Sequence, residues 1–151
     1  MSVEIIEVVG APSSVRELLY DVLYKDFGVD KAADNWFHQE RGGEFLLKID
    51  SAYEIMGIAR LMPVTDNDPS SRQVRQVAVA KNAQGRGVGR ELMTIVEELA
   101  LDQGASRLWL ESRSVAYGFY GSLGYEDDGE EFMSELTHIP HRHMHKNLLS
   151  A

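Results

Sequence analysis

The sequence predicts one α/β domain in which a mixed β-sheet carries helices on both faces. Three observations lead to this prediction: segments with strand and helix spacing alternate along the chain, neighbouring strands are joined in some places by short turns and in others by a helix, and glycines stand at the junctions. A chain of 151 residues has the size of a single domain. The expected elements amount to six or seven strands flanked by about four helices.

Two helices and three strands are expected in the first half of the chain. Ser14 and Glu17 fit a capping box at the start of the first helix, and apolar residues then recur at helical spacing up to Phe27. The second helix has a weaker pattern, and the pair Gly42 and Gly43 ends it. The expected elements are a strand at 3–9, helices at 12–27 and 30–41, and a hairpin of strands at 44–49 and 53–62.

The second half begins with a loop rich in Asp, Asn, Pro and Ser at 65–71. After the next strand comes a long helix with one apolar face, and Gly104 behind it is a typical C-cap. Gly124 marks the end of a shorter helix. The expected elements are strands at 73–80 and 107–111, helices at 87–103 and 115–123, a strand from 125 onward and a last strand at about 138–146.

Residues 84–89 read Gln-Gly-Arg-Gly-Val-Gly between a strand and a helix. Free N–H groups and the dipole at a helix start favour an anion, and glycine lets that anion approach the backbone closely. The turn lacks the third glycine of the dinucleotide-binding fingerprint and the Gly-Lys-Ser/Thr of a Walker motif. We therefore expect a phosphate-bearing ligand here, the alternative being a tight turn that binds nothing. Residues 69–90 contain no Asp or Glu but five basic residues: Arg72, Arg75, Lys81, Arg86 and Arg90.

The composition excludes several classes of protein. No apolar run is long enough to cross a membrane, and the N-terminus has neither the basic nor the long apolar segment of a signal peptide, so a cytoplasmic protein without membrane contact is expected. The chain has no cysteine, which excludes disulfides, cysteine zinc sites and a cysteine nucleophile. A net charge of −9 disfavours general binding of nucleic acid.

A second motif lies one strand after the helix that follows the glycine turn, where residues 116–125 read Ala-Tyr-Gly-Phe-Tyr-Gly-Ser-Leu-Gly-Tyr. The two motifs together resemble the GCN5-related N-acetyltransferase (GNAT) superfamily. Its acetyl-CoA signature, Gln/Arg-x-x-Gly-x-Gly/Ala, is met by Gln84, Gly87 and Gly89, and its later signature, Ala-x-x-Phe-Tyr-x-x-Leu-Gly-Tyr/Phe, is met by the second motif. Residues 139–144, Ile-Pro-His-Arg-His-Met, are similar to the ending of the ElaA-like branch.

The resemblance implies a fold, a cosubstrate and site residues. The sheet would be twisted, mostly antiparallel and splayed between the strands at 73–80 and 107–111, which would admit the pantetheine arm of acetyl-CoA. Tyr120 falls on the family's general acid, which would contact the cosubstrate and protonate the departing CoA thiolate. Arg113 and Ser114 occupy the region where many members have Asn. The implied acetyl-CoA contacts are Val77, Ala78 and Val79 on the strand, and Gln84, Gly85, Arg86, Gly87, Val88, Gly89 and Arg90 around the pyrophosphate.

A protonated amine must lose a proton before it attacks a thioester, and a carboxylate or a histidine, often through water, can accept that proton. Glu111 and His141 are the two candidates, and the sequence does not separate them. His141, His143 and His145 alternate, so on a strand they share one side. Two of them could reach one metal ion, but no acidic partner is clearly placed, and no metal is expected. A solvated strand, or one facing a second copy in a homodimer, is the favoured interpretation.

The sequence therefore favours an N-acetyltransferase that moves an acetyl group from acetyl-CoA directly to a primary amine of a small molecule or peptide. The absent cysteine removes the most obvious covalent carrier. The alternative is a non-catalytic acyl-CoA-binding regulatory module. The acceptor regions implied by the resemblance, residues 24–41 and 130–145, are aromatic and acidic, which suits a cation unless the acids are merely solvated. The aromatic and histidine residues are Tyr24, Trp36, Phe37, His38, Phe132 and His141, and the acids are Asp26, Asp30, Asp34, Glu130, Glu131 and Glu135.

Overall fold

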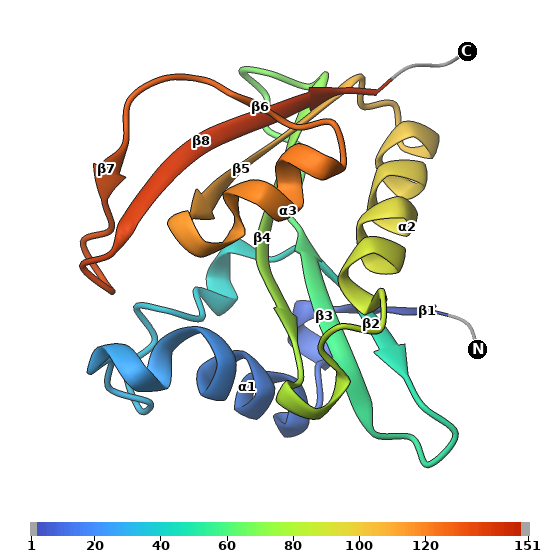
Figure 1. The fold of residues 1–151 in the computed structure, drawn as a ribbon. Coiled ribbons are helices and arrows are strands. Elements are labelled where there is room, and N and C mark those ends of the chain that lie inside the picture. The colour runs from blue at the N-terminus through green and yellow to red at the C-terminus, as the bar shows by residue number, and fades with distance from the viewer. Residues whose placement is uncertain (1–2, 149–151) are drawn as a thin grey trace.

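Eight strands form one sheet in the computed structural model, which describes residues 3–148 (Figure 1). They are β1 (Val3–Glu7), β2 (Glu44–Ile49), β3 (Ile55–Leu61), β4 (Ser71–Val79), β5 (Arg107–Arg113), β6 (Glu126–Asp127), β7 (Phe132–Met133) and β8 (Pro140–Asn147). The order is β1-β2-β3-β4-β5-β8-β6, with β7 paired to β8. Only β4 and β5 run parallel, which confirms the predicted mixed, mostly antiparallel sheet. The count exceeds six or seven because the chain before β8 adds two short strands to it.

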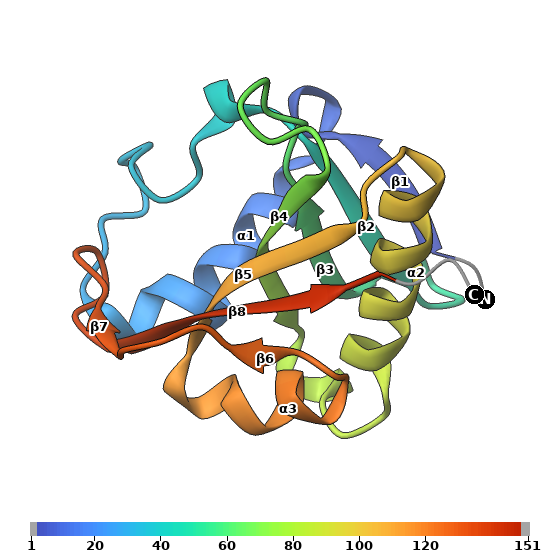
Figure 2. The ribbon, with the colours of Figure 1, turned by 90° about the horizontal axis from the view of Figure 1, so that it is seen from above.

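Helices cover both faces of the sheet, as the sequence predicts (Figures 1 and 2). They are α1 (Ser13–Leu19), α2 (Val88–Asp102) and α3 (Tyr117–Ser122). Leu92 of α2 and Tyr120 of α3 belong to one core, and Val15 and Leu19 of α1 belong to a second core on the other face. The α1 helix continues as a π-helical turn over Tyr20–Tyr24 and a 3-10 turn over Lys25–Phe27. From residue 3 to residue 148, no helix is long and apolar enough to cross a membrane.

The predicted capping box at the start of α1 does not form. The N-cap is Pro12, and no side chain caps the helix. Because the helix begins at Ser13, Ser14 lies inside the first turn and the Val15 N–H donates to the Pro12 carbonyl at 3.0 Å. Glu17 instead accepts a hydrogen bond from Lys31 Nζ at 2.5 Å.

The predicted helix at 30–41 is wrong. Only Gln39–Arg41 forms a 3-10 turn, and His38 has a left-handed backbone with φ 52°. In a helix, the backbone carbonyl groups of this segment would accept hydrogen bonds from N–H groups of the same helix. Here several of them accept hydrogen bonds from distant side chains instead, which stabilises the irregular backbone. Arg16 binds the carbonyls of Lys31 and Ala33, Gln76 binds that of Trp36, and Arg60 binds those of Phe37, His38 and Gly42.

The β4 and β5 strands separate after a short paired stretch, which confirms the predicted splay. Their pairing runs from Ser71 with Arg107 to Gln73 with Trp109, and no later pair joins them within residues 3–148. A β-bulge lies just beyond, where Gln76 has φ 53° and the β3–β4 register shifts between Ile58 and Arg60. A bulge bends its strand, so β4 turns away while β5 stays paired with β8 along its whole length.

Candidate active site

The divergence of β4 and β5 opens a cavity of about 750 Å³. Tyr120 from the α2–α3 side and Tyr24 from the α1 side both line it, so the cavity passes through the sheet between the two strands. Glu111 of β5 and His141 of β8 line it as well. The fold thus brings the three predicted catalytic residues, Tyr120, Glu111 and His141, to one cavity from three separate elements.

The Tyr120 hydroxyl is held in place by packing rather than by a hydrogen bond. The side chain is 7% exposed, and its ring lies 5.0 Å from that of Phe119 and 5.8 Å from that of Tyr125, edge to face in both cases. No hydrogen bond to the hydroxyl is found among the residues that the structure describes. Burial raises the pKa of Tyr120, and the charge of Arg113 offsets part of this rise. The hydroxyl therefore stays protonated at neutral pH and is free to donate into the cavity.

His141 and Glu111 share the face of the sheet that lines the cavity. His141 pairs with Arg113 across β5 and β8, and His143 pairs with Glu111. His141 Nδ1 lies 3.0 Å from the Ile139 carbonyl oxygen, which can only accept a hydrogen bond. In the neutral imidazole this contact places the proton on Nδ1 and leaves the lone pair on Nε2, which can then accept a proton. Glu111 is exposed at the cavity wall.

The alternating histidines share one face, as predicted, but they make different contacts. His143 packs its ring 4.9 Å from Phe132 and 6.0 Å from Trp109. His145 Nδ1 forms a hydrogen bond with Asp128 Oδ1 at 2.5 Å. In the described part of the chain, no group of three or more His, Cys, Asp or Glu side chains is arranged to hold a metal ion.

The glycine turn leads from the end of β4 into α2. Gly85 and Gly87 have φ 79° and 80°, and a Cβ atom added at either would meet no atom within 4 Å. Gly89 differs, because its Cβ would lie 3.1 Å from Phe119 Cζ, so this glycine lets α2 approach α3. The first N–H groups of α2 lack helical partners, and no side chain caps them in the described residues. The side chain of Gln84 donates to the Val79 carbonyl at 3.2 Å and ties the turn to β4.

The basic residues around the turn are more dispersed than the sequence suggests. Arg72 is buried, and it donates to the Met62 carbonyl at 2.7 Å and to Gln103. Arg75 lines the cavity instead of the turn. Lys81, Arg86 and Arg90 are the basic residues within or beside the turn, and all three are exposed.

The acceptor side of the cavity differs from the acidic pocket that the sequence suggests. Tyr24, His38 and Phe132 line it, whereas Trp36 and Phe37 are buried in the α1-side core. Of the six acids considered, Glu135 alone is among the lining residues. Sequence reasoning missed Arg75 as an acceptor-side residue, although the alternation of residues 73–75 along the strand was an available signal. The other acids, Asp26, Asp30, Asp34, Glu130 and Glu131, lie outside the lining.

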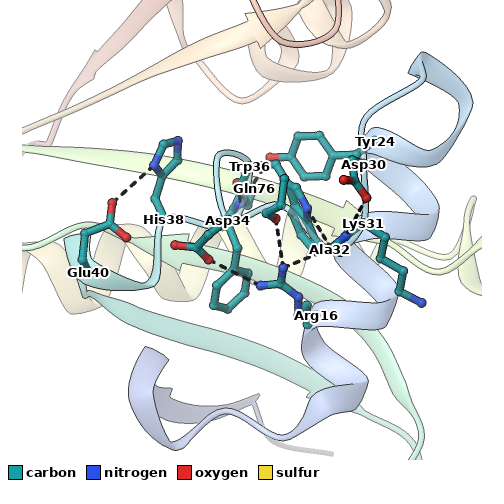
Figure 3. A network of polar contacts seen from close by, with 12 residues as sticks. Arg16, Tyr24, Asp30, Lys31, Ala32, Asp34, Trp36, His38, Glu40 and Gln76 are labelled. Atoms are coloured by element: carbon teal, nitrogen blue, oxygen red, sulfur yellow. Dashed lines mark hydrogen bonds and ion pairs between the residues drawn. The ribbon is translucent and has the colours of Figure 1, made fainter.

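A hydrogen-bonded network fixes the wall formed by the segment after α1 (Figure 3). Gln76 at the β-bulge donates to the Trp36 carbonyl at 2.8 Å and to the Tyr24 hydroxyl at 3.2 Å. The guanidinium of Arg16 lies over the Trp36 ring, 4.4 Å from its centre. These contacts tie the bulge to Tyr24, so the shape of the cavity depends on the strained backbone of Gln76.

Comparison with known proteins agrees with this geometry. The model of the acetyltransferase (GNAT) family matches residues 13–125, which include the glycine turn and Tyr120. N-acetyltransferase 8 of Rattus norvegicus is 32% identical over 104 residues, which cover 65% of this chain and 46% of that protein. The chain spans between 22% and 52% of the length of the first curated relatives it matches.

Two solved structures have the same fold. An aminoglycoside 6'-N-acetyltransferase complexed with coenzyme A has a TM-score of 0.78 at 14% identity, covering 100% of this chain and 99% of that one. Escherichia coli ElaA has a TM-score of 0.65 at 19% identity, covering 96% and 99%. These identities show the fold alone, whereas the family match covers most of the sequence. The chain belongs to the GNAT family of acetyltransferases.

Proposed function

We propose that this protein is an acetyl-CoA-dependent N-acetyltransferase that moves the acetyl group directly to a primary amine in a ternary complex. The observation that carries the proposal is the single cavity lined by Tyr120, Glu111 and His141, beside the unpaired edge of β4. A structural neighbour complexed with coenzyme A supports a CoA-type cosubstrate.

The cosubstrate would lie along β4 and end at the glycine turn. Beyond Gln73 the side of β4 toward β5 has no strand partner in the described residues, so the backbone of Val77, Ala78 and Val79 can pair with the pantetheine arm. The free N–H groups at the start of α2 suit the pyrophosphate. Gln84, Gly85, Arg86, Gly87, Val88, Gly89 and Arg90 surround that position.

The reaction would use two groups of this chain for proton transfer. His141 Nε2 accepts a proton from the ammonium form of the acceptor, directly or through water, and the neutral amine nitrogen then attacks the thioester carbonyl carbon. When the carbon–sulfur bond breaks, the thiolate takes the proton of the Tyr120 hydroxyl, and the second proton that the nitrogen loses returns to Tyr120 through water. Arg113 stabilises the tyrosinate that results, because its charge opposes the rise in the pKa of Tyr120.

The direct test is a panel of primary amines with acetyl-CoA, in which released CoA is detected by a thiol reagent. The chain has no cysteine, so the protein gives no background signal. Turnover of one or more amines is expected. If acetyl-CoA stabilised the protein against heat but no amine were acetylated, the protein would be a binding module instead.

Gly87→Asp is expected to weaken acetyl-CoA binding by about 10- to 100-fold, because it places a negative charge where the pyrophosphate approaches. Thermal-shift titration with acetyl-CoA measures the effect. Gly87→Asn is the matched control, since it has the same shape and the same left-handed backbone at φ 80° without the charge. Equal affinities for the two variants would contradict a phosphate site at this turn.

His141→Gln is expected to lower kcat/KM by about 10²-fold. This loss of kcat/KM is at the lower end of the range expected for removal of a general base, because His141 lines an open cavity in which water can accept the proton. Glu111→Gln should keep most of the wild-type kcat/KM. If Glu111→Gln caused the large loss and His141→Gln did not, the two roles would be reversed.

A further inference from the structure

Arg75 is a half-buried cation without a counterion. Its side chain lines the cavity, and in the described residues its guanidinium has no hydrogen bond and no ion pair. Burial and the nearby charge of Arg41 both lower the pKa of Arg75. Buried arginines elsewhere in this chain are satisfied: Arg72 and Arg60 donate to backbone carbonyls. A half-buried guanidinium without a counterion is unfavourable, and a ligand that pairs with it would offset this cost.

The carboxylate whose charge acts on Arg75 is that of Glu111, which lines the same cavity from β5. The two side chains belong to β4 and β5, which have already separated, and no ion pair joins them. Open space between two opposite charges fits a ligand that carries both signs. Arg41 adds positive charge on the side of Arg75. The guanidinium of Arg41 donates a hydrogen bond to Gln73 Oε1 at 3.5 Å.

The rest of the lining agrees with a ligand of mixed charge. Arg75 and Arg113 balance Glu111 and Glu135, so the cavity has no acidic surplus despite the net charge of −9 on the chain. A purely cationic acceptor would meet the unpaired guanidinium of Arg75 and be repelled.

We propose that the acceptor is a primary amine that also carries a carboxylate, with the carboxylate bound by Arg75 and the amino group on the side of Glu111 and His141. This inference rests on the proposed N-acetyltransferase function and names its substrate class. A guanidinium suits a carboxylate because it can donate two parallel hydrogen bonds to it.

Matched pairs of acceptors test the proposal: 4-aminobutyrate with 4-aminobutanamide, and 6-aminohexanoate with 6-aminohexanamide. These chains separate the two groups enough that the carboxylate changes the basicity of the amine little. With acetyl-CoA saturating, kcat/KM for the better acid is expected to exceed that of its amide by about 10- to 100-fold. Arg75→Gln should reduce this preference to near unity, and Arg75→Lys should retain part of it.

Two further readouts separate binding of the acceptor from other roles of Arg75. The Tm of Arg75→Gln is expected to rise by roughly 2–4 °C, since the variant removes an uncompensated charge. Its affinity for acetyl-CoA should be unchanged. A weaker affinity for acetyl-CoA would assign Arg75 to the cosubstrate and overturn the proposal.

Equal turnover of acids and amides by the wild type, or a preference that survives in Arg75→Gln, would also overturn it while leaving the N-acetyltransferase function intact. If no amine of any kind were acetylated, the function itself would be refuted, and the substrate class with it.

Discussion

Tyr120→Phe is expected to lower kcat by about 10²–10⁴-fold with little change in acetyl-CoA affinity. The hydroxyl acts only when the thiolate leaves, so its loss affects the transition state and not the bound ground state. Phenylalanine keeps the ring contacts with Phe119 and Tyr125, which should preserve the packing of α3. Because the side chain is 7% exposed, water cannot easily replace the lost acid.

Steady-state kinetics with the best acceptor and a thermal-shift titration with acetyl-CoA measure the two parts of this prediction. Tyr117→Phe is the matched control: it lies in the same helix, and its hydroxyl bonds to exposed Glu131 at 3.1 Å. The control should keep wild-type turnover. Wild-type turnover in Tyr120→Phe as well would remove Tyr120 from the mechanism.

The pH dependence of the wild-type enzyme follows from the same residue. Burial raises the pKa of Tyr120 above its ordinary value of 10.0, so the acid form persists to higher pH than for a free tyrosine. Loss of kcat through ionisation of Tyr120 is therefore expected only above pH 10. A profile of kcat against pH that included an alkaline limb near neutrality would assign that limb to another group.

The sequence predicted the half of the fold that contains the glycine turn well because its signals are local. The glycine turn predicted the start of α2 to within one residue, and Gly104 its end, since both depend on backbone conformations that only nearby residues decide. The second motif located Tyr120 in the same way. Its meeting with Glu111 and His141 depends on the order of the strands in the sheet, which local signals do not give.

The acceptor half could not be predicted from local signals. Residues 30–41 have enough apolar spacing for a helix, but Arg60 and Gln76, from later strands, satisfy their carbonyl groups in an irregular path. The direction of each acidic side chain in this half depends on that path. Arg75 is a similar case, because its lack of a partner follows from the separation of β4 and β5, which only long-range pairing determines.

Arg60 is the residue on which this acceptor wall most depends. Its side chain is fully buried, and it donates to the carbonyls of Phe37 at 2.5 Å, His38 at 2.8 Å and Gly42 at 2.7 Å, and to Gln76 Oε1 at 3.0 Å. Burial lowers the pKa of Arg60 to about 10, so the charge remains at neutral pH and strengthens these hydrogen bonds.

Arg60→Met is expected to lower the free energy of unfolding by about 3–5 kcal/mol. Methionine retains the aliphatic packing beside Phe37 and Phe45, but it leaves several buried carbonyl groups without a donor. The removed cost of burying a charge offsets only part of this loss. Urea unfolding without ligand measures this loss. The control is Arg107→Met, which removes a half-exposed arginine 3.5 Å from Asp128 and is expected to change the free energy of unfolding by no more than about 1 kcal/mol.

Arg60→Met should also distinguish the acceptor side of the cavity from the glycine turn. His38 and Tyr24 line the acceptor side of the cavity and are held through the network of Arg60 and Gln76, so the KM of the acceptor should rise in Arg60→Met. The glycine turn lies outside this network, and acetyl-CoA affinity should be unchanged at a temperature where the variant is folded. Hydrogen exchange should accelerate at residues 37–42 before it does in α2. Equal loss of protection in both segments would mean that Arg60 supports the whole fold and not the acceptor wall.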